Sequence, residues 1–240
     1  MFGKGIYKYK DNRLFKGIFK NNYPIKGIIT YYNKNILDKN FTENNDKEKY
    51  DIYEGECNEK GCKKGEGIMK YKNGIIYEGH WDNDIENGKG LLCSNEYDYN
   101  LFKNNKILIN SLCEMKKLNF KDTFYYGDFK NKIKDGKGIS LLKNEELFSD
   151  NYKEGIFEGE FKNNKKIGKG KIYLNDNSIF FCYWSNNKID KEREAKFLLY
   201  GLIEIKNNLN SNIWDYSIHN AKKKYYGDSR KKSLKKTKFR

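Results

Sequence analysis

Hydrophobic and polar residues alternate along short stretches of this chain, and each stretch is followed by a polar turn. Residues 77–81 read Tyr-Glu-Gly-His-Trp. In a strand, the first, third and fifth of these side chains lie on one face and the other two on the opposite face. Turn-forming Asp-Asn-Asp follows at 82–84, and a return segment starts with Gly-Lys-Gly at 88–90. The pattern predicts a β-hairpin.

The same unit recurs at least five times. Its opening aromatic residue keeps a nearly constant spacing to the first glycine of a Gly-x-Gly, as Tyr53 does to Gly65 and Tyr77 to Gly88. The spacing of successive openings lies in the range of roughly 20 to 50 residues that is typical of repeat arrays. The earliest copy is Phe15 to Phe19 with Gly27, residues 3–5 are the second half of a truncated unit, and residues 180–184 are a decayed opening. The residues predicted to define the repeat structurally are Tyr53, Gly55, Gly65, Gly67, Tyr77, Gly79, Trp81, Gly88, Gly90, Tyr125, Gly127, Phe129, Gly136, Gly138, Phe157, Gly159, Phe161, Gly168 and Gly170.

The central glycine of each opening strand indicates that another group lies close to the backbone there. The simplest occupant is an aromatic ring from the neighbouring unit. Because a lone hairpin is marginally stable, stacked hairpins would gain stability unit by unit as they bury an aromatic stripe. The predicted fold class is therefore all-β: an elongated single-layer antiparallel array of hairpins, with a short C-terminal helix and a disordered basic tail.

Tyr-Glu-Gly-x-Trp, a polar turn and Gly-x-Gly together resemble the membrane occupation and recognition nexus (MORN) repeat, over roughly residues 1–190. Three units depart from that pattern, and we expect them to be distorted or to carry loops. The stretch 98–124 keeps only the Phe-Lys-Asn-Asn of an opening strand, Ile29 stands where the second glycine of the first unit belongs, and Cys182 stands at the glycine position of the last opening.

The resemblance implies a scaffold that binds protein partners through its grooved aromatic face and inter-repeat loops. It also implies roles in cytoskeletal or membrane-associated assemblies, and self-association as a homodimer.

The chain is predicted to divide into a hairpin array at 1–206, a C-terminal segment at 207–226 and a basic tail at 227–240. Polar insertions at 33–49 and 143–154 are interpreted as solvated loops, and the apolar stretch 197–205 as the last strand. One stripe of a helix in the C-terminal segment is formed by Trp214, Ile218, Ala221 and Tyr225. That helix either caps the sheet edge or lies in a membrane interface.

The chain carries 48 Lys and Arg against 33 Asp and Glu, a net charge of +15. Residues 221–240 contain ten of these basic residues and one acid, which leaves the array about +6. Such a run is expected to be disordered. The residues predicted to bind an anionic surface are Lys222, Lys223, Lys224, Arg230, Lys231, Lys232, Lys235 and Lys236. Acidic phospholipid is the preferred surface. A two-part nuclear import signal is the alternative, and nucleic acid is not expected as a partner.

No catalytic, metal-binding or cofactor-binding residues are predicted. The two histidines lie far apart in sequence, no Gly-Lys-Gly continues into a phosphate-binding loop, and Glu54, Glu78, Glu158 and Glu160 recur because each opening strand has a polar face. The five cysteines are scattered and are interpreted as reduced cytosolic thiols, with Cys57 and Cys62 the pair that could bridge.

The protein is thus predicted to be a non-catalytic scaffold in the cytoplasm, associated peripherally with a membrane or with the cytoskeleton. No apolar run of the sequence approaches the length of roughly 18 residues that a membrane-spanning helix needs. The alternatives are a regulatory subunit that docks onto an enzyme, and a nuclear protein imported through the basic tail.

Overall fold

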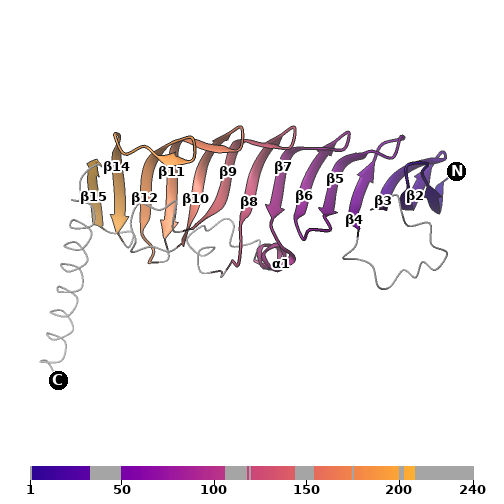
Figure 1. The fold of residues 1–240 in the computed structure, drawn as a ribbon, viewed down its shortest axis with the longest axis horizontal. Coiled ribbons are helices and arrows are strands. Elements are labelled where there is room, and N and C mark those ends of the chain that lie inside the picture. The colour runs from indigo at the N-terminus through magenta and orange to yellow at the C-terminus, as the bar shows by residue number, and fades with distance from the viewer. Residues whose placement is uncertain are drawn as a thin grey trace, which may run out of the picture. The chain divides into compact units, whose positions relative to one another are not determined.

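The computed structural model describes residues 2–32, 50–105, 118, 120–143, 154–174, 176–199 and 203–208. The chain forms two compact units, the first made of residues 1–106 and 120–140 and the second of residues 107–119 and 141–240. In each unit, antiparallel strands pair in the order in which they occur along the chain (Figure 1). The predicted all-β antiparallel array of hairpins is confirmed.

The first unit contains β1 (Phe2–Lys8), β2 (Arg13–Lys20), β3 (Tyr23–Tyr31), β4 (Asp51–Cys57), β5 (Lys63–Lys70), β6 (Ile76–Asp82), β7 (Ile85–Cys93), α1 (Glu96–Asn104), β8 (Phe124–Lys130) and most of β9 (Ile133–Lys143). The second contains the end of β9, then β10 (Glu154–Lys162), β11 (Lys165–Leu174), β12 (Ile179–Ser185), β13 (Lys188–Ile189), β14 (Glu194–Leu199) and β15 (Ile203–Asn208).

The hairpins are stacked in register on their glycines. In the first unit, one glycine from each of nine strands lies opposite the next, in the row Gly5, Gly17, Gly27, Gly55, Gly67, Gly79, Gly90, Gly127 and Gly138. In the second unit, Gly159 pairs with Gly170, and Gly170 with Cys182. Cys182 therefore stands at the glycine position of its strand, as predicted.

The turns that close the hairpins use left-handed backbone at two successive residues, as the Asn- and Asp-rich sequences predict. At Asn83 and Asp84, for example, φ is 48° and 67°. The same conformation occurs at Asn21-Asn22, Asn131-Lys132, Asn163-Asn164 and Asn186-Asn187.

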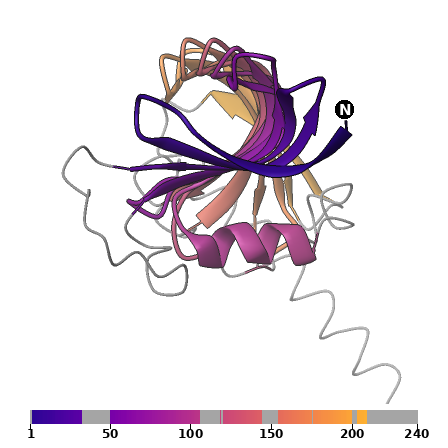
Figure 2. The same ribbon diagram turned by 90° about the vertical axis from the view of Figure 1, so that its right-hand side faces the viewer.

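The two glycines of each Gly-x-Gly differ in conformation. The first has a positive φ in four hairpins, at Gly65, Gly88, Gly136 and Gly168. It lies where the register between the two strands shifts, so it forms part of a β-bulge. A bulge bends its strand. Because the bulges recur at the same height, the strands of the first unit curve together (Figure 2).

The register corrects the reading of the first hairpin. Gly27 pairs with Gly17 and Gly55, so it is the second glycine of its unit and not the first. Ile25 takes the place of the first glycine. Ile29, which we expected at the second position, lies fully buried between Phe15 and Tyr53.

The stretch 98–124, predicted to be a degenerate hairpin with a remnant opening strand, begins inside α1 instead. The Asn95 side chain caps the helix by accepting the Asp98 N–H at 2.8 Å. Buried Asp98 accepts the N–H groups of Lys121 and Asp122, each at 2.7 Å. The carboxylate thereby ties α1 to the chain entering β8.

The apolar stretch 197–205 is not a single strand, because β14 ends at Leu199 and β15 begins at Ile203. β15 ends at Asn208, just beyond the end of the predicted array. Three predictions lie outside the described residues: the loop at 33–49, the loop at 143–154 apart from its two end residues, and the helix and tail beyond 208.

Candidate partner-binding surface

Each hairpin presents an aromatic face, which carries the opening aromatic residue and the central glycine, and a polar face formed by the alternate positions. On the aromatic face the rings of Tyr53, Tyr77 and Tyr125 are fully buried. Each hydroxyl donates a hydrogen bond to the carbonyl oxygen three residues later, at 2.7, 3.1 and 2.9 Å respectively. The ring is therefore fixed over its own strand.

The ring that lies on each glycine pair comes from the same hairpin, which corrects the expectation of a ring from the neighbouring unit. A Cβ atom added to Gly67 would lie 2.3 Å from the Tyr53 hydroxyl, and one added to Gly90 would lie 2.6 Å from the Tyr77 ring. In the second unit Phe157 takes this place over Gly159 and Gly170. The ring thus packs directly on the backbone of the two glycines, because they lack a Cβ atom.

Neighbouring hairpins interlock through the other aromatic residues. Trp81 contacts Tyr53 of the preceding hairpin edge to face, with ring centroids 5.5 Å apart, and its indole N–H donates to the Gly67 carbonyl at 3.1 Å. Phe129 contacts Tyr77 in the same way at 5.1 Å. Because these rings are buried, they form the core. Partners therefore cannot bind the rings of a grooved aromatic face, which corrects that expectation.

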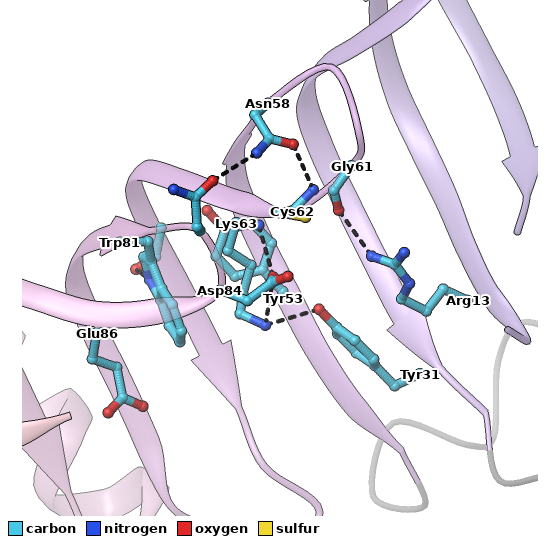
Figure 3. A network of polar contacts seen from close by, with 12 residues as sticks. Arg13, Tyr31, Tyr53, Asn58, Gly61, Cys62, Lys63, Trp81, Asp84 and Glu86 are labelled. Carbon is cyan, nitrogen blue, oxygen red and sulfur yellow. Dashed lines mark hydrogen bonds and ion pairs between the residues drawn. The ribbon is translucent and has the colours of Figure 1, made fainter. Parts of the chain in front are cut away.

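A buried lysine completes the aromatic face near the turns (Figure 3). The Lys63 ammonium donates to the Tyr31 hydroxyl at 3.0 Å, pairs with Asp84 at 3.1 Å, and lies 5.0 Å from the centroid of the Trp81 ring. Burial disfavours its charged form, but Tyr31 and Asp84 outweigh that penalty and raise the Lys63 pKa. Lys63 is therefore a structural cation in a ring-lined site.

The same network links one hairpin to the next. Asp84, in the turn after β6, accepts the Lys63 N–H at 2.8 Å, and its own N–H donates to the Lys63 carbonyl at 3.0 Å. Burial opposes ionisation of Asp84, yet the Lys63 N–H and ammonium lower its pKa. In the second unit Asn187 accepts the Lys166 N–H at 2.7 Å. The second turn residue thus fastens its hairpin to the preceding one.

The glutamates of the polar face are held by basic and hydroxyl groups. Glu78 accepts from Lys103 at 2.6 Å and from Tyr99 at 3.0 Å, both on α1. Glu158 accepts from Lys171 and Tyr173, and these two partners lower its pKa against the opposing effect of burial. Glu78 and Glu158 thus lie on the polar face, each bonded to neighbouring side chains. His80 is exposed, as predicted, and its Nδ1 lies 3.3 Å from Glu66.

The cysteines Cys57, Cys62, Cys93 and Cys182 are free thiols. Burial raises the pKa of Cys57, Cys93 and Cys182 to about 12. These three side chains are therefore protonated at neutral pH and pack as small apolar groups. Among the described residues, no group of three or more His, Cys, Asp or Glu side chains could hold a metal ion.

The exposed apolar side chains are concentrated on the first three strands. Phe2 is 71% exposed and Ile6 64%, and Tyr7, Tyr23 and Ile28 are also exposed. A hollow of about 420 Å³ opens beside Lys4, Gly5, Ile6, Lys16, Gly17 and Ile18. This surface was missed by the sequence analysis. Its signal is the near absence of acidic residues between 2 and 32, where Asp11 is the only one.

The basic residues predicted to bind an anionic surface, from Lys222 to Lys236, lie outside the described residues. A search for membrane-spanning segments, confined to the described ranges, found no helix with the necessary length and apolar character.

Three segments of the chain, residues 77–97, 125–144 and 157–179, match the family model of the MORN repeat. Among solved structures, the chain is similar to the SAS-4 (dCPAP) TCP domain of Drosophila melanogaster, whose structure is a complex with a proline-rich motif of Ana2 (dSTIL). The identity is 12%, the match covers 85% of this chain and 88% of that one, and the TM-score is 0.29. Among curated proteins there is no match.

Proposed function

We propose, from the three segments that match the MORN repeat, that this protein is a non-catalytic scaffold. It binds partner proteins along its hairpin array and attaches to an anionic surface, acidic phospholipid in the first place, through its basic C-terminal segment. A cytoskeletal surface of the same charge is the alternative site of attachment.

The uneven distribution of charge supports this proposal most directly. Residues 221–240 contain ten Lys or Arg and one acid, whereas residues 33–220 contain 31 basic and 31 acidic residues. A charge excess caused only by general lysine enrichment would be spread along the chain. Most of the excess lies instead in residues 221–240, which favours a specific electrostatic role for this segment.

The size of the effect is sufficient for reversible attachment. Each Lys or Arg close to an anionic leaflet contributes about 1 kcal/mol. Ten such residues would therefore give several kcal/mol even when only part of the segment lies at the surface. Because mobile ions screen exposed charges over about 8 Å at physiological salt, this binding should weaken as salt is added.

Sedimentation with vesicles tests the attachment. We expect the full chain to sediment with vesicles of phosphatidylcholine and phosphatidylserine, and not with phosphatidylcholine alone. Removal of residues 221–240 should abolish sedimentation and leave the circular-dichroism spectrum unchanged.

A matched control distinguishes an effect of the C-terminal segment from an effect of the total charge of the protein. The variant Lys222→Gln/Lys223→Gln/Lys224→Gln should lose binding. Lys60→Gln/Lys72→Gln/Lys188→Gln removes as much charge from exposed positions of the array and should retain it. Equal loss in both variants, or sedimentation of the truncated chain, would rule out attachment through this segment.

A further inference from the structure

The strand β1 has one edge that no other described strand covers. Tyr9 follows the last residue of β1, and its N–H donates to the Arg13 carbonyl at 2.8 Å. This bond determines which residues of β1 are hydrogen-bonded to β2. Hydrogen-bonded and non-bonded pairs alternate in an antiparallel ladder. Tyr7, Gly5 and Gly3 are therefore bonded to β2. The N–H and C=O groups of Phe2, Lys4, Ile6 and Lys8 point to the open edge.

The same four residues share one face of the strand and are all exposed. Phe2 and Ile6 are apolar, and Lys4 and Lys8 alternate with them. The hollow beside Ile6 continues this apolar surface onto Ile18 of β2. Edge and face together thus present free backbone groups, an apolar hollow and flanking ammonium groups.

The positive charge of this part of the chain favours an acidic partner. Residues 2–32 contain seven Lys or Arg and one acid, and that acid, Asp11, is paired with Arg13 at 2.9 Å. Because residues 33–220 carry equal numbers of basic and acidic residues, the excess charge outside residues 221–240 lies on β1 to β3 and their turns. Lysines on an edge strand repel a second copy of the same strand.

We propose that the open edge of β1 binds an extended acidic segment of a partner protein, which adds to the sheet as a further strand. Its backbone pairs with Phe2, Lys4, Ile6 and Lys8. Its apolar side chains enter the hollow, and its carboxylates lie beside Lys4 and Lys8. Strand addition of this kind takes affinity from backbone hydrogen bonds and specificity from alternate side chains. The inference rests on the proposed role in binding partner proteins.

A membrane is the less suitable occupant of this surface. Lipid chains would cover the apolar side chains but would leave the outward-pointing N–H and C=O groups of β1 without partners, which is strongly unfavourable in an apolar medium. An extended peptide satisfies those groups and the charge together.

The test uses a synthetic probe and the full chain. The probe is a short fluorescent peptide of alternating Glu and Ile, and its control is the same peptide with N-methyl groups on alternate amides. We expect saturable binding by fluorescence anisotropy, with affinity reduced at least about tenfold for the methylated peptide. Hydrogen exchange should show new protection at Lys4 and Ile6 and little change in β5 and β6.

A pair of variants at one position isolates the backbone contribution. Lys4→Gln removes the charge and keeps the N–H group, whereas Lys4→Pro removes both. The β1–β2 ladder does not use that N–H, and an edge strand tolerates proline there. We expect Lys4→Pro to bind the probe about tenfold more weakly than Lys4→Gln, with unchanged circular dichroism of both variants.

Equal binding of the two peptides, or of the two variants, would overturn strand addition. Binding of phosphatidylserine vesicles that Ile6→Glu abolishes, without binding of the probe, would assign this surface to a membrane instead. These outcomes can be distinguished from those of the vesicle test of the scaffold proposal, which depends on residues 221–240 and is carried out with β1 intact.

Discussion

At the scale of single residues, the two glycines of each Gly-x-Gly serve different physical purposes. The first adopts a left-handed backbone at a bulge, where φ is 67° at Gly65 and 69° at Gly88. The second lies under the ring of the opening tyrosine or phenylalanine, where a Cβ atom has no room. Spacing alone cannot distinguish these two roles. They follow from which glycine pairs across the strands.

We predict that Gly79→Ala strongly destabilises the protein. Its new Cβ would lie 2.5 Å from the Lys89 carbonyl oxygen and 2.6 Å from the Gly90 Cα, so the strands would have to separate. We expect a loss of at least about 2 kcal/mol in the free energy of unfolding, measured by urea denaturation. The control is Gly3→Ala, whose Cβ meets nothing within 4 Å. Similar stability of the two variants would contradict the close backbone contact between Gly79 and Gly90.

The ion pair of Asp84 with Lys63 gives a second prediction at this scale. Asp84→Asn should keep the turn and the bond to the Lys63 N–H, since Asn187 makes the equivalent bond to Lys166. The variant loses only the negative charge. Because 40% of the Asp84 side chain is exposed, solvent limits the expected loss of stability at pH 7 to about 1 kcal/mol.

The pH dependence of that difference has a definite sign. Folding lowers the Asp84 pKa from its ordinary value of 3.8, so the stabilisation is present above this value and is lost as the pH falls through the lower, folded pKa. Urea denaturation of both proteins between pH 7 and about pH 2 should show a constant difference at neutral pH and stabilities that converge below pH 3.8. A difference that stays constant would show that the charge is not its cause.

At the scale of elements, the hairpins could be predicted and the helix could not. Alternation, turn chemistry and glycine spacing are local, so they identify β4 to β9 directly. The stretch after β7 resembles a degraded repeat, because its Phe-Lys-Asn-Asn also fits an opening strand. The helical signals are Asn95 as a cap and Tyr99 and Phe102 on one face. The contact that fixes α1, between Asp98 and residues 121–122, is not local and could not be inferred.

Replacement of Asp98 by alanine should release α1. The change leaves the buried N–H groups of Lys121 and Asp122 without acceptors, so we expect a loss of about 2–4 kcal/mol. Hydrogen exchange should accelerate in residues 96–104 more than in β4 and β5. Glu96→Gln, which affects only an exposed pair with Lys70, is the control and should change neither measurement. Uniformly faster exchange throughout the first unit would mean that Asp98 acts on global stability instead.

At the scale of the whole molecule, the charge is divided among three segments. Both ends are basic, and residues 33–220 are balanced. An average over the whole array hides this division and leaves the tail as the only evident excess. The surface on β1 became visible only when the strands showed which lysines share a face with Phe2 and Ile6.

The regular register predicts that whole hairpins can be removed. Deletion of residues 52–75 takes out one complete repeat and brings Tyr77 to the place of Tyr53, so that Gly79 would pair with Gly27. We expect a folded protein with a smaller denaturant m-value, since less surface is buried. Deletion of residues 52–63 removes half a repeat and reverses the strand direction, and it should not give cooperative unfolding. Equal folding of both deletions would show that the register is not decisive.

Each turn is hydrogen-bonded to the preceding hairpin, so the hairpins can assemble in the order in which they are synthesised. Asp84 and Trp81 both bond to β5, which leaves the ribosome earlier. Translation at roughly 5–20 residues per second supplies a repeat every few seconds, while a hairpin closes in about 1–10 μs. Each new hairpin can therefore pack on the already folded preceding hairpin before the next one is synthesised. The array can thus fold during translation, before the C-terminus is made.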